Sequence, residues 1–340
     1  MINRRNLIKT GALAIAGLAL GTSLMAQSKT EGRRVGIIGL DTSHSIAFTK
    51  VLNDANVGDT FANYKVVAAY PQGSLDIKSS VDRIEGNTEQ IKKLGVEIVS
   101  SIDELLTKVD VVLLETNDGR RHLEQALPVL KAGKRMFIDK PMAASLADAM
   151  VIFNAAKHYN VPVFSASSLR YIKGMDEVKG GSVGKVLGTE AYSPCALEKT
   201  HPDFFWYGIH GVETLFTAMG TGCKTVVRAT TTDTDMAIGT WNDGRIGSFR
   251  GLRAGKPNYG GTVFGEKATV TLGSYNGYNP LLVEIVKYFQ TGIVPVQPEE
   301  TLEILAFMEA ADLSKKKGGV PVAIDEVMKK AQKQSSKYKF

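Results

Sequence analysis

Lys140 has the residue type and the sequence setting for work on protons. It follows the apolar run 135–138 and precedes Pro141, so the pattern places an ammonium group at the end of a buried strand. An ammonium group in that position can donate a hydrogen bond to a hydroxyl, or carry a proton if its pKa is lowered. Pro141 permits a cis peptide bond here. The alternative is a surface lysine before a turn.

The loop after the first apolar run has the position of a phosphate-binding loop but only part of its chemistry. Such loops carry glycines so that backbone N–H groups reach a pyrophosphate at the start of a helix, usually as G-x-G-x-x-G. Here the loop reads GLDTSH from Gly39. Asp41 replaces the second glycine and would repel and crowd a pyrophosphate, whereas Thr42, Ser43 and a protonated His44 would donate compensating hydrogen bonds. Alternatively, Asp41 or Ser43 caps the following helix.

The end of the second apolar run leaves the form of the dinucleotide open. An acidic residue there usually binds the ribose 2′-hydroxyl of NAD, and a nearby arginine accommodates the 2′-phosphate of NADP. Residues 69–73 read AYPQG and contain neither. We therefore expect NAD or NADP, without a preference between them. Asp41→Gly is expected to strengthen dinucleotide binding.

The order of elements predicts the scaffold that positions these side chains. Between residues 31 and 165, short apolar runs alternate with helical segments, which is the pattern of a Rossmann-type, doubly wound parallel sheet in an α/β protein. The expected strands are 35–39, 64–70, 97–99, 109–115, 135–138 and 161–164. The expected helices are 44–53, one capped at Ser101 or Asp103, 122–132 and 145–159.

The pattern changes between residues 166 and 325. A strand near 185–192 and a helix over 205–219 precede Thr- and Val-rich runs with hairpin signals at 242–244 and within 262–272. We expect an α+β domain on an open antiparallel sheet, with helices at 280–289 and 298–315 and a last strand at 320–324. Residues 326–340 have the composition of a basic, solvated tail.

Residues 1–26 have the pattern of an export signal. Arg4 and Arg5 precede the apolar run 11–21, and Ala26 offers a small residue for cleavage. The paired arginines resemble a twin-arginine signal, which predicts an exported, periplasmic protein. The run is shorter than the ~20 residues of a spanning helix, so we expect no stable membrane span after cleavage. An uncleaved anchor is the alternative.

The charge and the cysteine content argue against a nucleic-acid-binding protein and against a zinc protein. The formal net charge is +6, and without the three basic residues of the first 26 positions, 38 basic residues face 35 acidic ones. This excess is too small for a nucleic-acid surface. Cys195 and Cys223 are the two cysteines, and the sequence leaves their pairing open. No Cys/His spacing of a zinc site is present, so no metal is expected.

Three segments together resemble the family of glucose–fructose oxidoreductase, inositol dehydrogenase and MocA. They are the apolar run ending at Gly39, the stretch 109–141 with its DKP motif, and residues 208–213 around His210. The similarity extends over nearly all of the chain after residue 26, and the middle stretch is the most specific. It implies a domain that binds NAD or NADP and a second domain whose sheet carries the substrate pocket and often a subunit interface, hence a homodimer or tetramer.

The resemblance also assigns roles to residues. It makes Lys140 and His210 the catalytic pair, although a helix histidine is also often structural. It implies a place for Arg170 near the substrate pocket. The residues that it brings close to the cofactor, besides the glycine loop and Lys140, are Thr116, Asn117, His122 and Asp139.

The chain departs from the family pattern one turn before His210. The family has an aspartate there and this chain has Trp206, so Asp203, His201 and Glu213 are the candidates to orient the histidine. Trp206 and Tyr207, with Phe205, are expected to form an aromatic wall against a sugar. Helix core is the alternative for two of these three aromatic residues.

These residues together predict hydride transfer between nicotinamide and a carbinol carbon of a sugar, sugar alcohol or glycoside. A redox-neutral NAD-dependent glycosidase is one alternative, because a tightly held cofactor can oxidise and then reduce the same substrate. A non-catalytic carbohydrate-binding protein on a degenerate dehydrogenase scaffold is the other. Asp41, the missing ribose acid and Trp206 favour this second alternative.

Overall fold

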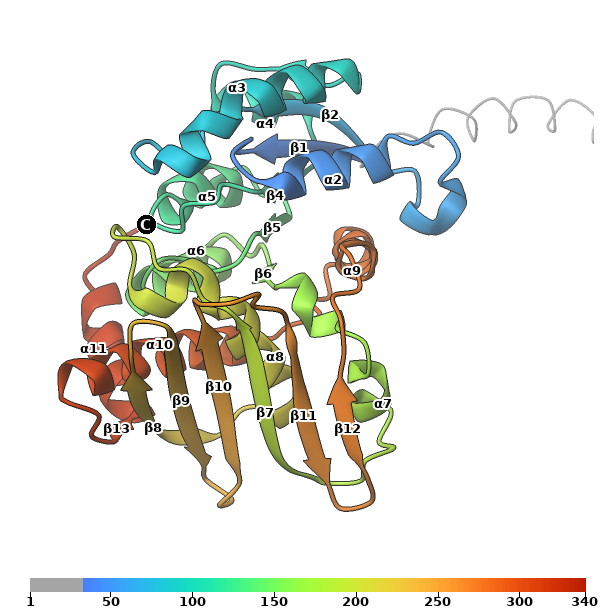
Figure 1. Cartoon of the computed structure of the whole chain (residues 1–340). Helices are drawn as coiled ribbons and strands as arrows, with labels where there is room; N and C mark the ends of the chain where they lie inside the picture. Colours follow the sequence, from blue (N-terminus) through green and yellow to red (C-terminus); the bar gives the residue numbers. More distant parts are fainter. Residues whose placement is uncertain (1–32) are drawn as a thin grey trace, which may run out of the picture.

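The computed structural model describes residues 33–340, so the predicted export signal at 1–26 lies outside the described residues. Two β-sheets organise the described part, one in its upper and one in its lower half (Figure 1). Among the helices of residues 33–340, none combines the length and the apolar character that a membrane crossing needs.

The first sheet confirms the predicted parallel, doubly wound architecture. Its six strands are all parallel and lie in the order β3-β2-β1-β4-β5-β6. Their bounds are β1 (Arg34–Ile38), β2 (Lys65–Tyr70), β3 (Glu97–Ile98), β4 (Val111–Leu114), β5 (Met136–Ile138) and β6 (Val163–Ser165). Strands β4, β5 and β6 are buried throughout, which explains their largely apolar runs.

Helices cover both faces of this sheet. One face packs on α2 (Ser43–Leu52), α3 (Lys78–Lys93) and, from the far end of the chain, α9 (Asn279–Thr291). The other face packs on α4 (Ile102–Lys108), α5 (His122–Lys131) and α6 (Leu146–His158). The cap predicted for α4 is Ser101, whose hydroxyl accepts a hydrogen bond from the Glu104 N–H at 3.1 Å. A short 3₁₀ turn, Gly58–Phe61, precedes β2.

The second sheet is mixed, which corrects the expectation of a purely antiparallel sheet. Seven strands lie in the order β12-β11-β7-β10-β9-β8-β13, and β7 and β10 run parallel. The chain passes through a helix and two strands between β7 and β10, and such a crossover allows parallel neighbours. Both predicted hairpins are confirmed, β9 with β10 and β11 with β12. The bounds are β7 (Val186–Pro194), β8 (Cys223–Thr230), β9 (Thr234–Trp241), β10 (Ile246–Leu252), β11 (Gly260–Gly265), β12 (Thr269–Leu272) and β13 (Val322–Ala323).

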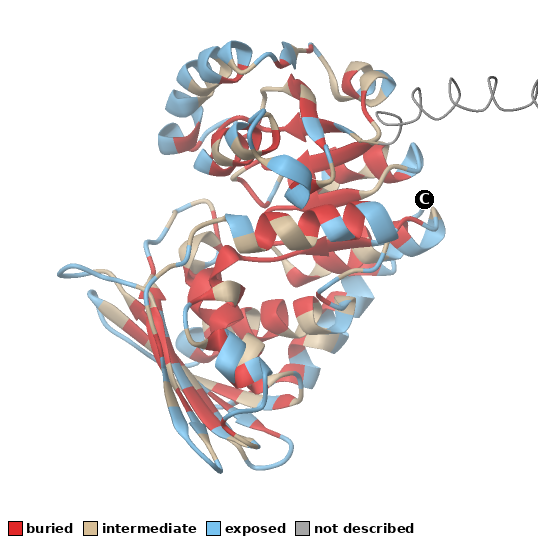
Figure 2. Ribbon diagram, turned by 90° about the vertical axis from the view of Figure 1, so that its right-hand side faces the viewer, coloured by how far each residue is buried: buried red, intermediate tan, exposed pale blue. Residues whose placement is uncertain are grey.

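One face of the second sheet packs on helices and the other stays open (Figure 2). The covering helices are α8 (Ile209–Met219) and α10 (Pro298–Lys316). A π-helical turn, Phe204–Gly208, precedes α8, while a 3₁₀ turn, Ser168–Tyr171, and α7 (Met175–Lys179) link the two sheets. The open face carries large apolar side chains, namely Leu187, Ile238, Ile246 and Phe264.

The end of the chain is a helix, not the solvated tail that its basic composition suggested. Helix α11 covers Ile324–Ser335. Val327 and Ala331 lie one turn apart on its buried face and join the core that contains α6. The apolar residues at helical spacing decide the fold of this segment, while its lysines stay on the solvent side. Cys195 and Cys223 are both buried and free.

Candidate functional site

A cavity of about 400 Å³ lies between the two halves of the molecule, at the carboxyl edge of the first sheet. Open α/β sheets bind ligands at this edge. Eight of the sequence-predicted site residues line it: Thr42, Ser43, His44, Asn117, Lys140, Trp206, Tyr207 and His210. The two predicted catalytic residues therefore face the same space although they belong to different domains.

Gly39 keeps the tight turn that the loop needs. Its φ is +89°, in the left-handed region that favours glycine. A Cβ atom at this position would lie 2.4 Å from the hydroxyl oxygen of Thr116 and 2.6 Å from its backbone. The glycine is therefore needed for the close approach of the loop to the end of β4.

The Asp41 carboxylate is buried within the protein, which corrects the expectation that it would repel a pyrophosphate at the loop. Its side chain is fully buried and accepts hydrogen bonds from the Ser74 N–H at 2.8 Å, the Ser74 hydroxyl at 2.7 Å and the Asn117 N–H at 3.0 Å. A Cβ atom on Gly73 would lie 2.4 Å from its carboxyl carbon. The carboxylate thus fills the gap between the ends of β2 and β4 and joins them.

The start of α2 remains free for an anion. Thr42 is the N-cap residue, and no side chain caps the helix, so the proposed caps Asp41 and Ser43 are both wrong. The Thr42 hydroxyl is buried without a hydrogen-bond partner. Unpaired N–H groups at a helix N-terminus bind phosphate groups, and an orphaned hydroxyl beside them is a further donor. The residues present therefore fit the pyrophosphate of a dinucleotide.

His122 and Thr116 are fully buried next to residues that line the cavity. The His122 Nε2 atom lies 2.7 Å from the Thr116 carbonyl oxygen, and its Nδ1 atom lies 3.0 Å from the Pro141 carbonyl oxygen. Burial lowers the pKa of this imidazole. His122 thus connects the end of β4 to the segment after β5, where the Lys140–Pro141 peptide bond is cis.

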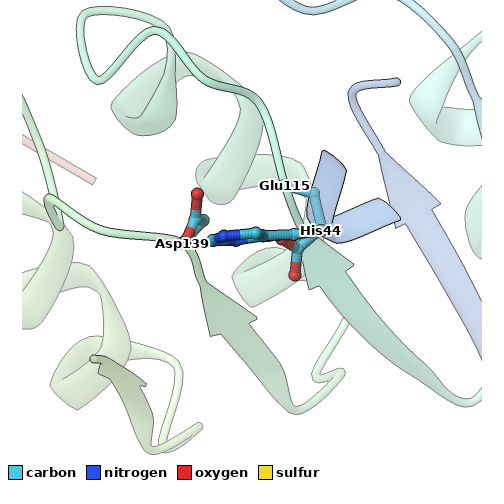
Figure 3. A group of neighbouring side chains, drawn as sticks. All are labelled: His44, Glu115 and Asp139. Carbon is cyan, nitrogen blue, oxygen red and sulfur yellow. Dashed lines mark hydrogen bonds and ion pairs between the residues drawn. The ribbon is translucent and has the colours of Figure 1, made fainter. Parts of the chain in front are cut away.

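Lys140 belongs to a buried cluster of charged groups. Its Nζ atom lies 3.2 Å from Asp139 Oδ2, and His44 Nδ1 lies 3.0 Å from Asp139 Oδ1. Figure 3 shows the His44 ring beside the carboxylates of Asp139 and Glu115. Burial opposes the ammonium charge, but Asp139 outweighs it and raises the pKa of Lys140. Lys140 is therefore charged at neutral pH and acts as a hydrogen-bond donor.

The other members of this cluster, His44, Glu115 and Asp139, shift the pKa values of one another. Burial opposes a charge on His44, but Asp139 and Glu115 outweigh it and raise the pKa of the imidazole to about 10. Burial raises the pKa of Glu115 to about 7, against the effect of His44. Burial also disfavours the charged form of Asp139, yet His44 and Lys140 lower its pKa.

His210 is neutral at the cavity wall. Burial lowers the pKa of its imidazole well below the usual value, and the charge of Lys140 acts in the same direction. Its Nδ1 atom lies 2.7 Å from the Ser167 hydroxyl oxygen. The tautomer that donates from Nδ1 to Ser167 leaves Nε2 as a proton acceptor.

Two of the candidates for orienting His210, namely Asp203 and His201, pair with other residues. Asp203 pairs with Arg228 at 2.7 Å and with Lys315 at 2.6 Å. His201 lies 3.3 Å from Asp118. Ser167, which the sequence did not indicate, is the observed partner, and its place two residues after the end of β6 was the available signal.

Arg170 and Glu213 form a network outside the cavity lining. The Arg170 guanidinium lies 3.4 Å from Glu213 and 2.6 Å from Glu300, and all three come from different elements of the second domain. Burial raises the pKa of Glu213 to about 7, although Arg170 opposes this. The structure therefore places both residues in internal ion pairs behind the wall that carries His210.

This raised pKa predicts a pH-dependent stability. The folded chain favours the protonated form of Glu213. The contribution of this proton to the free energy of unfolding is therefore complete below the usual carboxyl pKa, and it is lost as pH rises through about 7. Between pH 5 and 8 we expect the free energy of unfolding to fall, relative to Glu213→Gln, by roughly 1–3 kcal/mol. Denaturant unfolding of both proteins across this pH interval measures it, and parallel pH profiles would contradict it.

An aromatic wall lines the cavity beside His210, whose ring centroid lies 5.0 Å from that of Tyr207. Trp206 and Tyr207 belong to it, whereas Phe205 is fully buried in the core. The wall also contains three tyrosines that the sequence reading missed, Tyr259, Tyr275 and Tyr278. The Tyr207 and Tyr259 hydroxyl oxygens lie 2.9 Å apart. Their signal was the concentration of tyrosines in the turn segments after β10 and β12.

Ser79 and Arg83 extend the cavity along α3 and were also missed. They lie on the first turns of the helix that follows β2, where a Rossmann fold receives the adenosine half of a dinucleotide. Nothing in residues 69–73 pointed to them, because both follow that segment in the sequence.

The first domain is similar to a known protein family. Residues 33–167 match the model of the oxidoreductase family with the NAD-binding Rossmann fold. An uncharacterized oxidoreductase of Streptococcus pneumoniae is 29% identical over 126 residues, which cover 35% of this chain and 34% of that protein. The uncharacterized oxidoreductase YhhX of Escherichia coli is 26% identical over 140 residues, or 37% of this chain and 40% of that protein. The chain thus matches well under half the length of these curated relatives.

Solved structures extend the similarity of fold to both domains. A probable dehydrogenase from Thermotoga maritima has a TM-score of 0.70 at 20% identity, covering 86% of this chain and 99% of that one. Scyllo-inositol dehydrogenase from Lactobacillus casei with bound NAD(H) and scyllo-inositol has a TM-score of 0.65 at 16% identity, covering 86% and 99%. Identities this low establish the fold. The first domain therefore carries the NAD-binding Rossmann fold, and the chain shares the two-domain fold of these solved structures.

Proposed function

We propose that this protein is an NAD(P)-dependent oxidoreductase that acts on a carbinol carbon of a sugar or sugar alcohol. One observation carries the proposal: Lys140 and His210, from different domains, line one cavity at the carboxyl edge of an NAD-binding Rossmann fold. A structural neighbour that holds NAD(H) and scyllo-inositol supports the substrate class.

The chain offers groups for each part of the cofactor. The backbone N–H groups at the start of α2 and the Thr42 hydroxyl would hold the pyrophosphate. Ser79 and Arg83 line the same cavity on the side of α3 and would face the adenosine half. NAD(P), when bound, accepts the hydride of a carbinol carbon or returns it.

Lys140 and His210 divide the handling of the substrate oxygen. The charged Lys140 donates a hydrogen bond to this oxygen and stabilises the negative charge that grows on it as the hydroxyl loses its proton. The neutral His210 accepts that proton at Nε2, while Nδ1 donates to Ser167. In the reverse direction the same imidazole returns the proton.

The aromatic wall supports a carbohydrate substrate. Trp206, Tyr207, Tyr259, Tyr275 and Tyr278 combine ring faces with hydroxyl and indole N–H donors around one cavity. A sugar presents apolar C–H faces and a ring of hydroxyl groups, so both kinds of contact are available to it.

Calorimetric titration with NAD and with NADP tests the proposal first. We expect micromolar or tighter binding of one of them, followed by a substrate-dependent change of nicotinamide absorbance in a screen of sugars and polyols. Absence of binding for both dinucleotides, together with sugar binding, would replace the proposal with a non-catalytic carbohydrate-binding protein. The segment 69–73, which offers no acidic residue to the ribose of a dinucleotide, is the observation that favours this second candidate.

We further propose an exported, periplasmic protein, on the basis of the sequence pattern of residues 1–26. The apolar side chains on the open face of the second sheet support a homodimer or tetramer through that face.

A further inference from the structure

Three potential metal ligands meet below the cavity. Glu115 directly follows β4, Asp139 directly follows β5, and His44 lies in the first turn of α2 (Figure 3). One ligand atom from each of them lies within 4.8 Å of the others. Glu115 and Asp139 are fully buried and His44 is 7% exposed. These elements bring together side chains that lie far apart in the sequence.

The Glu115 carboxylate points to a missing partner. Neither of its oxygens has a hydrogen-bond partner within the described residues, and His44 Nδ1 lies 3.6 Å from Oε2, beyond hydrogen-bond length. A fully buried carboxylate without a partner is costly, because it has lost its water. The cluster contains two carboxylates, and Lys140 pairs with only one of them. A cation between the three side chains would supply the partner that the Glu115 oxygens lack.

The spacing of the ligand atoms suits a small divalent ion. His44 Nδ1 lies 3.0 Å from Asp139 Oδ1 and 3.6 Å from Glu115 Oε2. Ligand atoms that are each about 2.0–2.2 Å from one metal lie roughly 3.0–3.6 Å from one another. Both separations from His44 thus fall within this range, and the ligand atoms of the two carboxylates lie within 4.8 Å of each other. His44 also lines the cavity, so the cluster lies next to it.

We propose that His44, Glu115 and Asp139 bind one divalent transition-metal ion, with Zn²⁺ and Mn²⁺ as the most suitable candidates. One imidazole and two carboxylates match the ligand preferences of these ions better than those of Ca²⁺ or Cu⁺. Binding of the ion does not require the dinucleotide, because all three ligands belong to the chain itself.

The test uses the full chain without a histidine tag, freed of metal by a chelator and then dialysed. Calorimetric titration with Zn²⁺ and with Mn²⁺, in the absence of dinucleotide, is expected to show one equivalent bound per chain for at least one ion. Glu115→Gln and His44→Gln should each weaken this binding at least tenfold. The matched controls are Glu104→Gln and His158→Gln, because both residues lie outside the cluster, and they should leave the affinity unchanged.

A crystal soaked in Zn²⁺ locates the ion without any variant, and we expect its anomalous signal between His44, Glu115 and Asp139. The same ions should raise the melting temperature of the wild-type chain in a concentration-dependent way. The proposal is overturned if neither ion binds the folded wild type, if both variants bind like the wild type, or if the signal lies elsewhere. Dinucleotide binding is measured separately, so its failure would not affect this result.

Discussion

Lys140→Met is expected to lower kcat about 10²–10⁴-fold with little change in dinucleotide affinity. Lys140 is held by Asp139 at 3.2 Å, its ammonium group is charged, and it lines the cavity with His210. Methionine has a similar length but no donor, so negative charge on the substrate oxygen would lose its stabilising partner. Steady-state kinetics on the substrate found by screening measures the loss.

A control for Lys140→Met is Lys131→Met, since Lys131 is exposed in the last turn of α5. It should keep the wild-type kcat. The melting temperature of both variants must be compared, because the removal of Lys140 leaves His44 as the remaining cationic partner of Asp139. A folded Lys140→Met protein with wild-type kcat would remove Lys140 from the mechanism.

Asp41→Gly is expected to lower the free energy of unfolding by roughly 3–5 kcal/mol. The change would leave the Ser74 N–H, the Ser74 hydroxyl and the Asn117 N–H without their buried acceptor. Each unsatisfied buried donor costs about 1–3 kcal/mol. This replaces the sequence-based expectation of stronger dinucleotide binding, although the change restores the glycine of the usual loop. Denaturant unfolding measures the stability, and calorimetry the binding.

The matched control is Asp82→Ala on the exposed surface of α3, where Asp82 makes an ion pair with Lys78. Its effect should stay within about 0.5 kcal/mol. If Asp41→Gly were as stable as the wild type and bound NAD more tightly, then Asp41 would act on the cofactor and not on the joint between β2 and β4.

Most strands and helices of the first domain were predictable because their signals are local. The buried strands β4 and β5 are continuous apolar runs, and Gly133 follows α5 with a φ of +69°, as a helix stop requires. The second sheet was harder, since nothing local distinguishes the parallel neighbours β7 and β10 from antiparallel ones. Helix α11 was missed because its lysines outweigh Val327 and Ala331 in composition, although not in packing.

The candidate site was likewise predictable only in part from the sequence. Lys140 and His210 were found because each stands in a recognisable stretch, and the structure places both at one cavity. The sequence did not predict which side chains contact the residues of the site. Ser167 beside His210, and the engagement of Glu213 with Arg170, depend on how the domains pack and not on spacing along one helix.

The sequence by itself determined the alternation of strands and helices, the position of the loop at Gly39 and the Lys140–Pro141 motif, because the periodicity of apolar residues and the preferences of glycine and proline act over a few residues. Only the tertiary structure decided where Asp41 points and that His44, Glu115 and Asp139 meet. The strand order places β1, β4 and β5 side by side. Parallel neighbours end at the same edge, so side chains that follow different strands come into contact there, at distances that no local pattern contains.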